Sequence, residues 1–353
     1  MSLLEFETDG VVVNCNQGAG YFSIIKLGHD IHIFGRRAKN YSNTNHLIGA
    51  FDKGFEVKAS VLANSSACHN FSAFTSNEGT PFALGGQNTV ADRPHSAGLY
   101  LFRTSDASTF DRGQLVVDGN HPGIVNAREI WGMLGDIDGP PSCFYCSGNQ
   151  QYYVFLRANP KRGERRIQFA AGRNLKKLGG FQMLDERYIR LEEDDFFYGP
   201  CFQYIDGVFL GLLPVVNPRY TALRLVASYN GRDWVPCQDF FPKKPWFNEA
   251  GDPKPCDFPA QGFLVEEDVV RFGIHHNFLR GESDGPTYLS FKTLSREKLI
   301  NLCKEKLQAY RWRILRRAIG RNIADVFWLR MPEVFRLWHP KSSEGLIKRS
   351  RQG

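Results

Sequence analysis

The sequence predicts an all-β fold, a five-bladed β-propeller with a C-terminal helical appendage, from its composition and from one recurring strand pattern. Aromatic residues make up 13% of the 353 residues, and 34 glycines and 18 prolines supply many turns. Aromatic side chains favour strands, whereas glycine and proline favour the turns between them. The composition therefore favours numerous short strands over long helices.

The recurring pattern is a short, aromatic-rich strand followed by a turn and a second strand. Its copies begin roughly 50 to 70 residues apart, which is typical of propeller blades. Strands inside a blade are covered on both faces, so they are almost continuously apolar. We therefore expect five blades over residues 1–294, with a pair of irregular β-sandwiches as the alternative. The copies are Ile31–Gly35, Gly98–Arg103, Tyr152–Arg157, Gly207–Leu213 and Val269–Gly273.

The pattern changes after Leu294, where a helical appendage over residues 295–353 is expected. Ser295 is a suitable N-cap, and apolar residues then recur at three- and four-residue steps between basic residues, as in an amphipathic helix. From Arg296 onward there are 15 basic and 5 acidic residues, so the positive charge of the chain lies in this segment. The apolar stripe consists of Leu299, Leu302, Cys303, Leu307, Tyr310, Ile314 and Leu315.

A basic amphipathic helix can lie on an anionic lipid surface. We therefore expect residues 295–353 to hold the protein at an anionic membrane surface. The alternative is that the same stripe packs on the propeller or on a second subunit. Nucleic acid is a weaker candidate partner, because the chain before residue 296 is slightly acidic.

Targeting and redox signals favour a cytoplasmic protein, with membrane association through the appendage. The acidic N-terminus has no basic flank before an apolar core, so it does not resemble a secretory signal. The eight cysteines are irregularly spaced, which is typical of reduced thiols. Cys143 and Cys146 form a C-x-x-C, but no second pair accompanies them, so neither a metal site nor a cofactor is expected.

Several sequence motifs, here called phrases, resemble those of five-bladed propeller proteins related to glycoside hydrolase families 43 and 32, over about residues 60–294. Asp195–Pro200, Tyr204–Leu213 and Leu225–Trp234 are similar to their D-F-Y-G, Y-x-G-x-Y-L-G and L-A-x-S-x-D-G-x-x-W phrases. The further matching segments, in the same order, are Cys68–Phe74, Gly98–Phe110, Ile137–Tyr145 and Cys256–Gly273.

The resemblance implies a funnel at one end of the propeller that binds a glycan and cleaves a glycosidic bond with paired carboxylates. The candidate catalytic residues are Asp138, Asp195 and Asp257, which begin strands of three different blades. Each also has a structural interpretation. Asp195 would belong to an acidic loop, Asp138 to an Asp-Gly-Pro-Pro turn, and Asp257 would cap a turn. If Asp195 is catalytic, its replacement by Asn should abolish turnover or weaken glycan binding with little loss of stability.

The candidate substrate-binding residues would supply hydrogen bonds, charge or stacking surfaces to a sugar. His69 and Asn70 would donate to hydroxyl groups, Arg157 would bind a carboxylate or phosphate, and Tyr198 would stack on a sugar ring. The histidine pair would bind a sugar or phosphate, although a hydrogen-bonded structural pair is the alternative. The complete set is His69, Asn70, Arg157, Tyr198, His275 and His276.

The chain also departs from the pattern of these enzymes. Members of family 43 carry Glu-Gly-Pro where this chain has Tyr198–Pro200, so their general acid is absent at that position. No Asn-Asp-Pro occurs near the N-terminus, where family 32 enzymes carry their nucleophile. Three functions therefore stay open. They are a glycoside hydrolase or transglycosidase, a glycoside phosphorylase that holds phosphate with Arg157, Arg271 and the histidine pair, and a non-catalytic glycan-binding propeller in polysaccharide assembly.

Overall fold

The computed structural model describes most of the chain and divides it into two compact units, Met1–Lys306 and Leu307–Gly353. Nearly all described residues belong to the first unit. The described residues are 4, 7–15, 19–37, 40–58, 70–87, 98–125, 137, 139–160, 164–243, 256–277 and 287–311.

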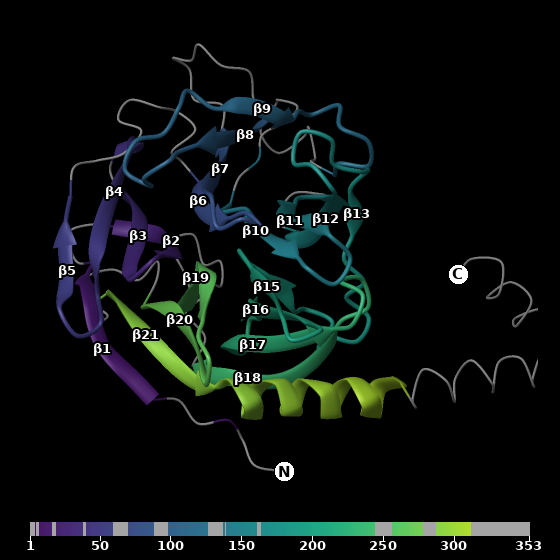
Figure 1. The fold of residues 1–353 in the computed structure, drawn as a ribbon. Helices are drawn as coiled ribbons and strands as arrows, with labels where there is room; N and C mark the ends of the chain where they lie inside the picture. The colour runs from purple at the N-terminus through teal and green to yellow at the C-terminus, as the bar shows by residue number, and fades with distance from the viewer. Residues whose placement is uncertain are drawn as a thin grey trace, which may run out of the picture. The chain divides into compact units, whose positions relative to one another are not determined.

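In the first unit, the described strands form antiparallel groups that stand side by side around a centre (Figure 1). In the first three groups, the strands follow one another in the chain and are hydrogen-bonded in that order. The first group is β2 (Ala19–Leu27), β3 (Asp30–Arg37), β4 (Asn40–Ala50) and β5 (Gly54–Val57). The second is β6 (Asn70–Thr75), β7 (Pro81–Gln87), β8 (Gly98–Arg103) and β9 (Gln114–Val117).

The remaining groups continue the same order around the ring. The third is β10 (Ser142–Cys146), β11 (Gln151–Ala158), β12 (Arg166–Gly172) and β13 (Gln182–Met183). The fourth is β14 (Phe196–Phe197), β15 (Cys201–Ile205), β16 (Val208–Val216), β17 (Thr221–Ser228) and β18 (Val235–Lys243), with β14 and β15 both paired to β16. The last is β19 (Asp257–Val265), β20 (Val269–His276), β21 (Tyr288–Ser295) and β1 (Glu7–Asn14).

Strands from both ends of this ring close it. The N-terminal strand β1 pairs antiparallel with β21, so the last group contains strands from the beginning and the end of the first unit. The first and last groups also meet through one parallel pairing of β19 with β2, at Gln261 and Ser23. Pairing of this kind leaves few open sheet edges at the junction. The predicted β-propeller is thereby confirmed as the fold.

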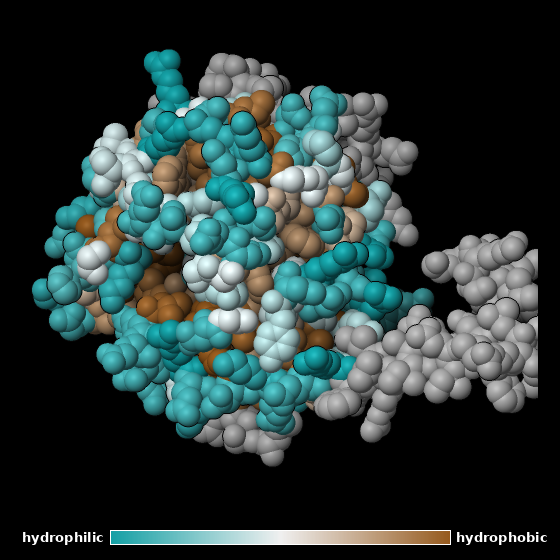
Figure 2. All heavy atoms as spheres, turned by 45° about the vertical axis from the view of Figure 1, so that its right-hand side comes forward, coloured by the Kyte–Doolittle hydropathy of each residue, from teal (hydrophilic) through white to brown (hydrophobic). Residues whose placement is uncertain are grey.

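The core consists of aromatic and aliphatic side chains between neighbouring groups. Every residue of β16 and β17 is buried, in agreement with the nearly continuous apolar runs in the sequence. One cluster joins the third and fourth groups, where the rings of Phe155 and Phe202 stack with centroids 3.9 Å apart and Trp234 is fully buried. Figure 2 shows that hydrophilic side chains cover much of one face and that hydrophobic ones line a hollow in it.

The recurring sequence pattern marks the strand at the second position of the hydrogen-bonded order in four groups and at the third position in one. Gly98–Arg103 forms β8, because β7 already occupies the second position of its group. β7 contains two consecutive glycines, Gly85 and Gly86, and lacks the aromatic-rich pattern that identifies the other second strands. The pattern therefore finds blades but does not always find the same strand within them.

A helix begins after β21 and is described over residues 296–311. The Ser295 hydroxyl accepts the backbone N–H of Lys298 at 3.4 Å, as expected for an N-cap. Leu299, Leu302 and Cys303 are buried, so this part of the predicted stripe packs on the propeller and cannot face lipid. The first compact unit accordingly extends past the expected boundary at residue 294. Residues 312–353 lie outside the described residues.

No helix in the described part of the chain is both long and apolar enough to cross a membrane.

Candidate binding site

The innermost strands of neighbouring groups begin at the same end of the propeller. A Cβ added at Gly199, before β15, would lie 2.6 Å from a ring carbon of Phe258 in β19 and 3.2 Å from Pro140, before β10. The side-chain amide of Asn70, the first residue of β6, is 3.5 Å from the carbonyl oxygen of Ile137. The starts of four inner strands are therefore in contact at this end, where Asn70 and Phe258 are buried.

An aromatic cluster lies at these strand starts. The ring of Phe258 has its centroid 5.6 Å from that of Tyr21 in β2 and 5.6 Å from that of Tyr198, and both pairs are edge to face. Edge-to-face packing places the positive edge of one ring on the negative face of another. Tyr21 occupies a left-handed backbone conformation with φ of 53°, at a bulge in the pairing of β2 with β3.

Arginine side chains cover the two tyrosines of this cluster. The guanidinium carbon of Arg36, in β3, lies 4.3 Å from the ring centroid of Tyr21, and that of Arg165 lies 4.9 Å from the centroid of Tyr198. A cation over a ring face is attracted by the ring quadrupole. Arg157, near the end of β11, passes beside Gly139, where an added Cβ would be 3.6 Å from the Arg157 Cβ atom. This end of the propeller therefore combines tyrosine rings with positive charge.

Asp257 begins β19 but its carboxylate turns into the last group. It lies 2.8 Å from Nδ1 of His276, its partner across β19 and β20, and Nε2 of the same ring lies 2.8 Å from the Ser290 hydroxyl. All three side chains are buried. This Asp-His-Ser chain ties three strands together and resembles a catalytic triad only in composition, because the serine has no access to a substrate.

The neighbouring histidine is also structural. His275 is buried against Phe22, with ring centroids 5.4 Å apart. Burial, together with the nearby His276 ring, lowers the pKa of His275 to about 3. His275 is therefore neutral at physiological pH, and it cannot supply the positive charge that a phosphate site needs.

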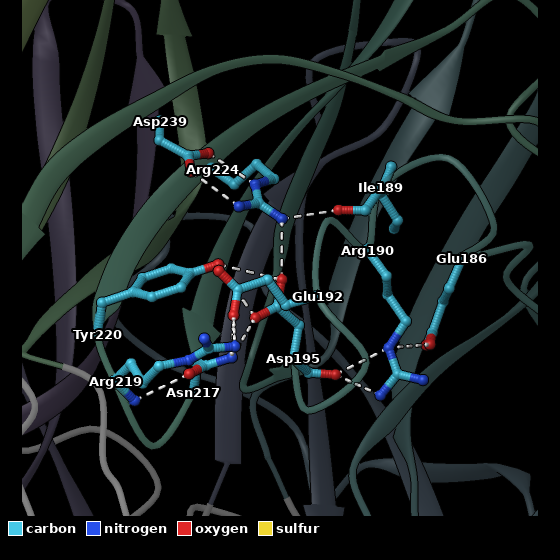
Figure 3. A network of polar contacts seen from close by, with 10 residues as sticks. All are labelled: Glu186, Ile189, Arg190, Glu192, Asp195, Asn217, Arg219, Tyr220, Arg224 and Asp239. Atoms are coloured by element: carbon cyan, nitrogen blue, oxygen red, sulfur yellow. Dashed lines mark hydrogen bonds and ion pairs between the residues drawn. The ribbon is translucent and has the colours of Figure 1, made fainter.

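Asp195 precedes β14 and lies in a buried polar network of the fourth group (Figure 3). Its carboxylate accepts hydrogen bonds from the Asn217 amide at 2.9 Å and from the Tyr220 hydroxyl at 3.0 Å. The guanidinium of Arg224 lies 3.4 Å from its second oxygen, and neither side chain is exposed. The carboxylate thus anchors the loop before β14 to the ends of β16 and β17.

The network continues through Arg224, which is shared by two carboxylates (Figure 3). It donates to both oxygens of Asp239 at 2.6 and 2.8 Å and to the carbonyl oxygen of Ile189 at 2.7 Å. Burial alone would lower the pKa of Arg224, but the Asp239 carboxylate raises it above the usual range. Arg224 therefore stays charged and compensates the buried negative charge of Asp195.

The structure places the candidate residues in three different settings. Asn70, Arg157 and Tyr198 lie at or beside the starts of inner strands and are themselves buried, and Asp195 and Asp257 are buried with partners in their own groups. His275 and His276 are buried in the last group. Asp138 and His69 lie outside the described residues. The catalytic roles of the aspartates stay predictions.

Sequence reasoning missed four residues at this end. Phe258 directly follows a predicted site residue, but Tyr21, Arg36 and Arg165 belong to no recognised phrase. The bulge at Tyr21 and the approach of Arg165 to another group arise only in the folded chain. Among the described residues, no group of three or more metal-ligating side chains could hold a metal ion.

Comparisons with known proteins relate the chain to glycosidases at the level of the fold. The sequence matches no protein-family model and no curated protein. A solved glycoside hydrolase is similar in structure with a TM-score of 0.54 and 10% identity, over 82% of this chain and 92% of the other. An α-L-arabinanase from Penicillium chrysogenum, complexed with arabinobiose, has a TM-score of 0.51 and 10% identity over 83% and 97% of the two chains.

A family 43 β-1,3-galactosidase with bound galactodeoxynojirimycin is similar to the same degree, with a TM-score of 0.50 and 12% identity over 82% of this chain and 93% of the other. The chain therefore has the propeller fold of family 43 glycoside hydrolases.

Proposed function

We propose that the protein is carbohydrate-active and binds a glycan at the end of the propeller where the inner strands begin. The observation that carries this proposal is the contact between the starts of four inner strands, where the cluster of Tyr21, Tyr198 and Phe258 lies beneath the partly exposed Arg36 and Arg165. Solved propellers of the same fold include a complex with arabinobiose. The shared fold supports a glycan as the ligand class.

Binding without cleavage is the form of this function that we favour. Glycoside hydrolysis needs two carboxylates, separated by about 5 Å for retention or roughly 6.5 to 9.5 Å for inversion. Asp195 and Asp257 are both buried and bound to partners of the fold, and Tyr198 stands where family 43 enzymes carry their general acid. A binding protein in polysaccharide assembly needs no such pair.

Two catalytic alternatives make different demands on the chain. Hydrolysis or transglycosylation would depend on Asp138 together with a second carboxylate. Phosphorolysis would need free cations for phosphate, but Arg271 is paired with Glu266 and lies over the ring of Phe51, and His275 is neutral.

The test measures binding and turnover on the same full-length protein. Glycan-array screening followed by titration calorimetry should identify a bound oligosaccharide, and incubation of that oligosaccharide with and without phosphate should leave it intact. Asp138→Asn should retain binding if Asp138 does no chemistry. Release of sugar by the unmodified protein, abolished in Asp138→Asn, would establish hydrolysis instead. Absence of binding to every glycan would refute the proposed function.

A further inference from the structure

We propose that the glycan carries negative charge, as a carboxylate or a phosphate, and that Arg36 and Arg165 bind it. This inference rests on the proposed function, because it assigns the chemical class of the ligand at the same end of the propeller. It follows from what covers the aromatic cluster, from how the two arginines are held, and from the charges around them.

The aromatic rings are covered and do not form an open stacking platform. Only 9% of Tyr21, 7% of Tyr198 and 1% of Phe258 is exposed. Arg36 and Arg165, which lie over the two tyrosines, are themselves partly exposed. A ligand that approaches these tyrosines therefore meets guanidinium groups before it meets ring faces. This arrangement favours an oxyanion over a neutral sugar ring.

Both arginines are held by the fold and not by long flexible loops. Arg36 lies near the end of β3, where its backbone pairs with Gly20 of β2 on one side and with Thr44 of β4 on the other. The bulge that follows Gly20 brings Tyr21 under the Arg36 guanidinium. Arg165 directly precedes β12 and reaches over Tyr198 of the next group.

A guanidinium group placed over a ring is suited to bind an oxyanion. Its hydrogen-bond donors lie in one plane and in a fixed fork, which matches two oxygens of a carboxylate or phosphate. Contact between the guanidinium and an aromatic ring limits the rotamers of the side chain, so less conformational entropy is lost when an anion binds. Lysine lacks the planar fork of donors, which predicts that it cannot replace these arginines fully.

The acidic residues next to Phe258 and Arg165 in the chain each have a side-chain partner. Asp257 is hydrogen-bonded to His276, and Glu164, the neighbour of Arg165 in the chain, is paired with Arg166. Arg157 adds a third positive charge beside Gly139. Opposite charges on ligand and site would speed their encounter and strengthen binding at low ionic strength.

The experiment uses an array of matched sugar pairs and the full-length protein. Each uronic-acid oligosaccharide is paired with its methyl ester, and each sugar phosphate with the unphosphorylated sugar, so that the two sources of the anion are tested separately. We expect the protein to bind the charged member of at least one pair about tenfold or more tightly, with affinity falling as salt rises.

Variants assign the effect to the two arginines. Arg36→Gln and Arg165→Gln should each weaken binding of the charged sugar by about tenfold to a hundredfold and leave binding of its neutral counterpart unchanged. Arg36→Lys should restore part of the affinity. The matched control is Arg219→Gln, which removes an exposed arginine paired with Glu192 and should change neither. Thermal melting of each variant checks that it is folded.

The outcomes separate this inference from the function on which it rests. Equal binding of charged and neutral members, with no effect of either arginine variant, would overturn the inference and leave glycan binding intact. An equal loss in Arg219→Gln would show a general charge effect and would also overturn it. Failure to bind any glycan, charged or neutral, would refute the proposed function itself.

Discussion

Replacement of Asp195 by Asn should destabilise the protein and leave glycan binding unchanged, contrary to what its sequence phrase implies. Its carboxylate accepts hydrogen bonds from Asn217 and Tyr220 and pairs with Arg224, and none of its surface is exposed. An amide at this position keeps one acceptor oxygen but directs an NH₂ group toward a donor. The buried network then contains a donor without an acceptor.

The expected loss follows from the contacts that change. One hydrogen bond to a charged group contributes about 1.5 to 3 kcal/mol, so Asp195→Asn should lower the free energy of unfolding by about that amount. Asp195→Ala removes every acceptor and reduces the compensation of Arg224, and it should cost about 3 to 5 kcal/mol. Asp194→Asn is the matched control, since Asp194 is exposed and its replacement should stay within about 0.5 kcal/mol.

The measurement combines urea unfolding with titration of a bound glycan. The order of stability should be wild type and Asp194→Asn, then Asp195→Asn, then Asp195→Ala, with unchanged glycan affinity in the folded variants. A stable Asp195→Asn protein that has lost glycan binding or turnover would refute this reasoning and would return Asp195 to the site.

Three further predictions concern pH and the C-terminal residues. Burial raises the pKa of Glu186 to about 7, despite nearby Arg166 and Arg190, so the native state binds a proton that the unfolded state releases above about pH 4.5. Stability should therefore fall by about 3 kcal/mol as pH rises from 4.5 to 7, and Glu186→Gln should flatten this slope in urea unfolding at each pH. Burial lowers the pKa of His46 to about 4, and its Nε2 atom lies 2.9 Å from Nδ1 of His32. The stability that the protein has above pH 6.5 should therefore be lost as the pH falls toward 4. A His46→Gln variant that loses stability equally over this pH range would contradict this prediction. Because the helix packs on the propeller as far as Cys303, we propose that membrane binding depends on residues 312–353, whose deletion should abolish salt-sensitive sedimentation with anionic vesicles while retaining thermal stability.

The sequence by itself determined the fold class, because its signals are local and repeated. Aromatic-rich strands separated by Gly and Pro recur at blade spacing, and burial on both faces requires the continuous apolar runs seen in β16 and β17. Ser295 and the apolar residues that follow it likewise predicted a helix from neighbouring positions alone. Such signals need no knowledge of distant parts of the chain.

The tertiary structure decided what each polar side chain does. Asp195 and Asp257 both stand in phrases typical of a glycosidase site, yet folding supplies Asn217, Tyr220 and Arg224 to one and His276 to the other. These partners lie 19 to 29 residues away in the chain, in the turn between β16 and β17, in β17 and in β20. A sequence motif gives the position of a carboxylate along the chain, but it does not show which hydrogen-bond donors surround that carboxylate in the folded protein.

The same limit explains why the arginine-covered tyrosines were not predicted. Arg36 meets Tyr21 because a bulge shifts the pairing of β2 with β3, and Arg165 meets Tyr198 because one group of strands packs beside the next. Neither contact produces a periodic pattern or a motif of fixed spacing in the sequence. Burial of apolar surface between distant parts of the chain determines strand register and the packing of neighbouring blades. Register and packing therefore decide which side chains meet at this end of the propeller.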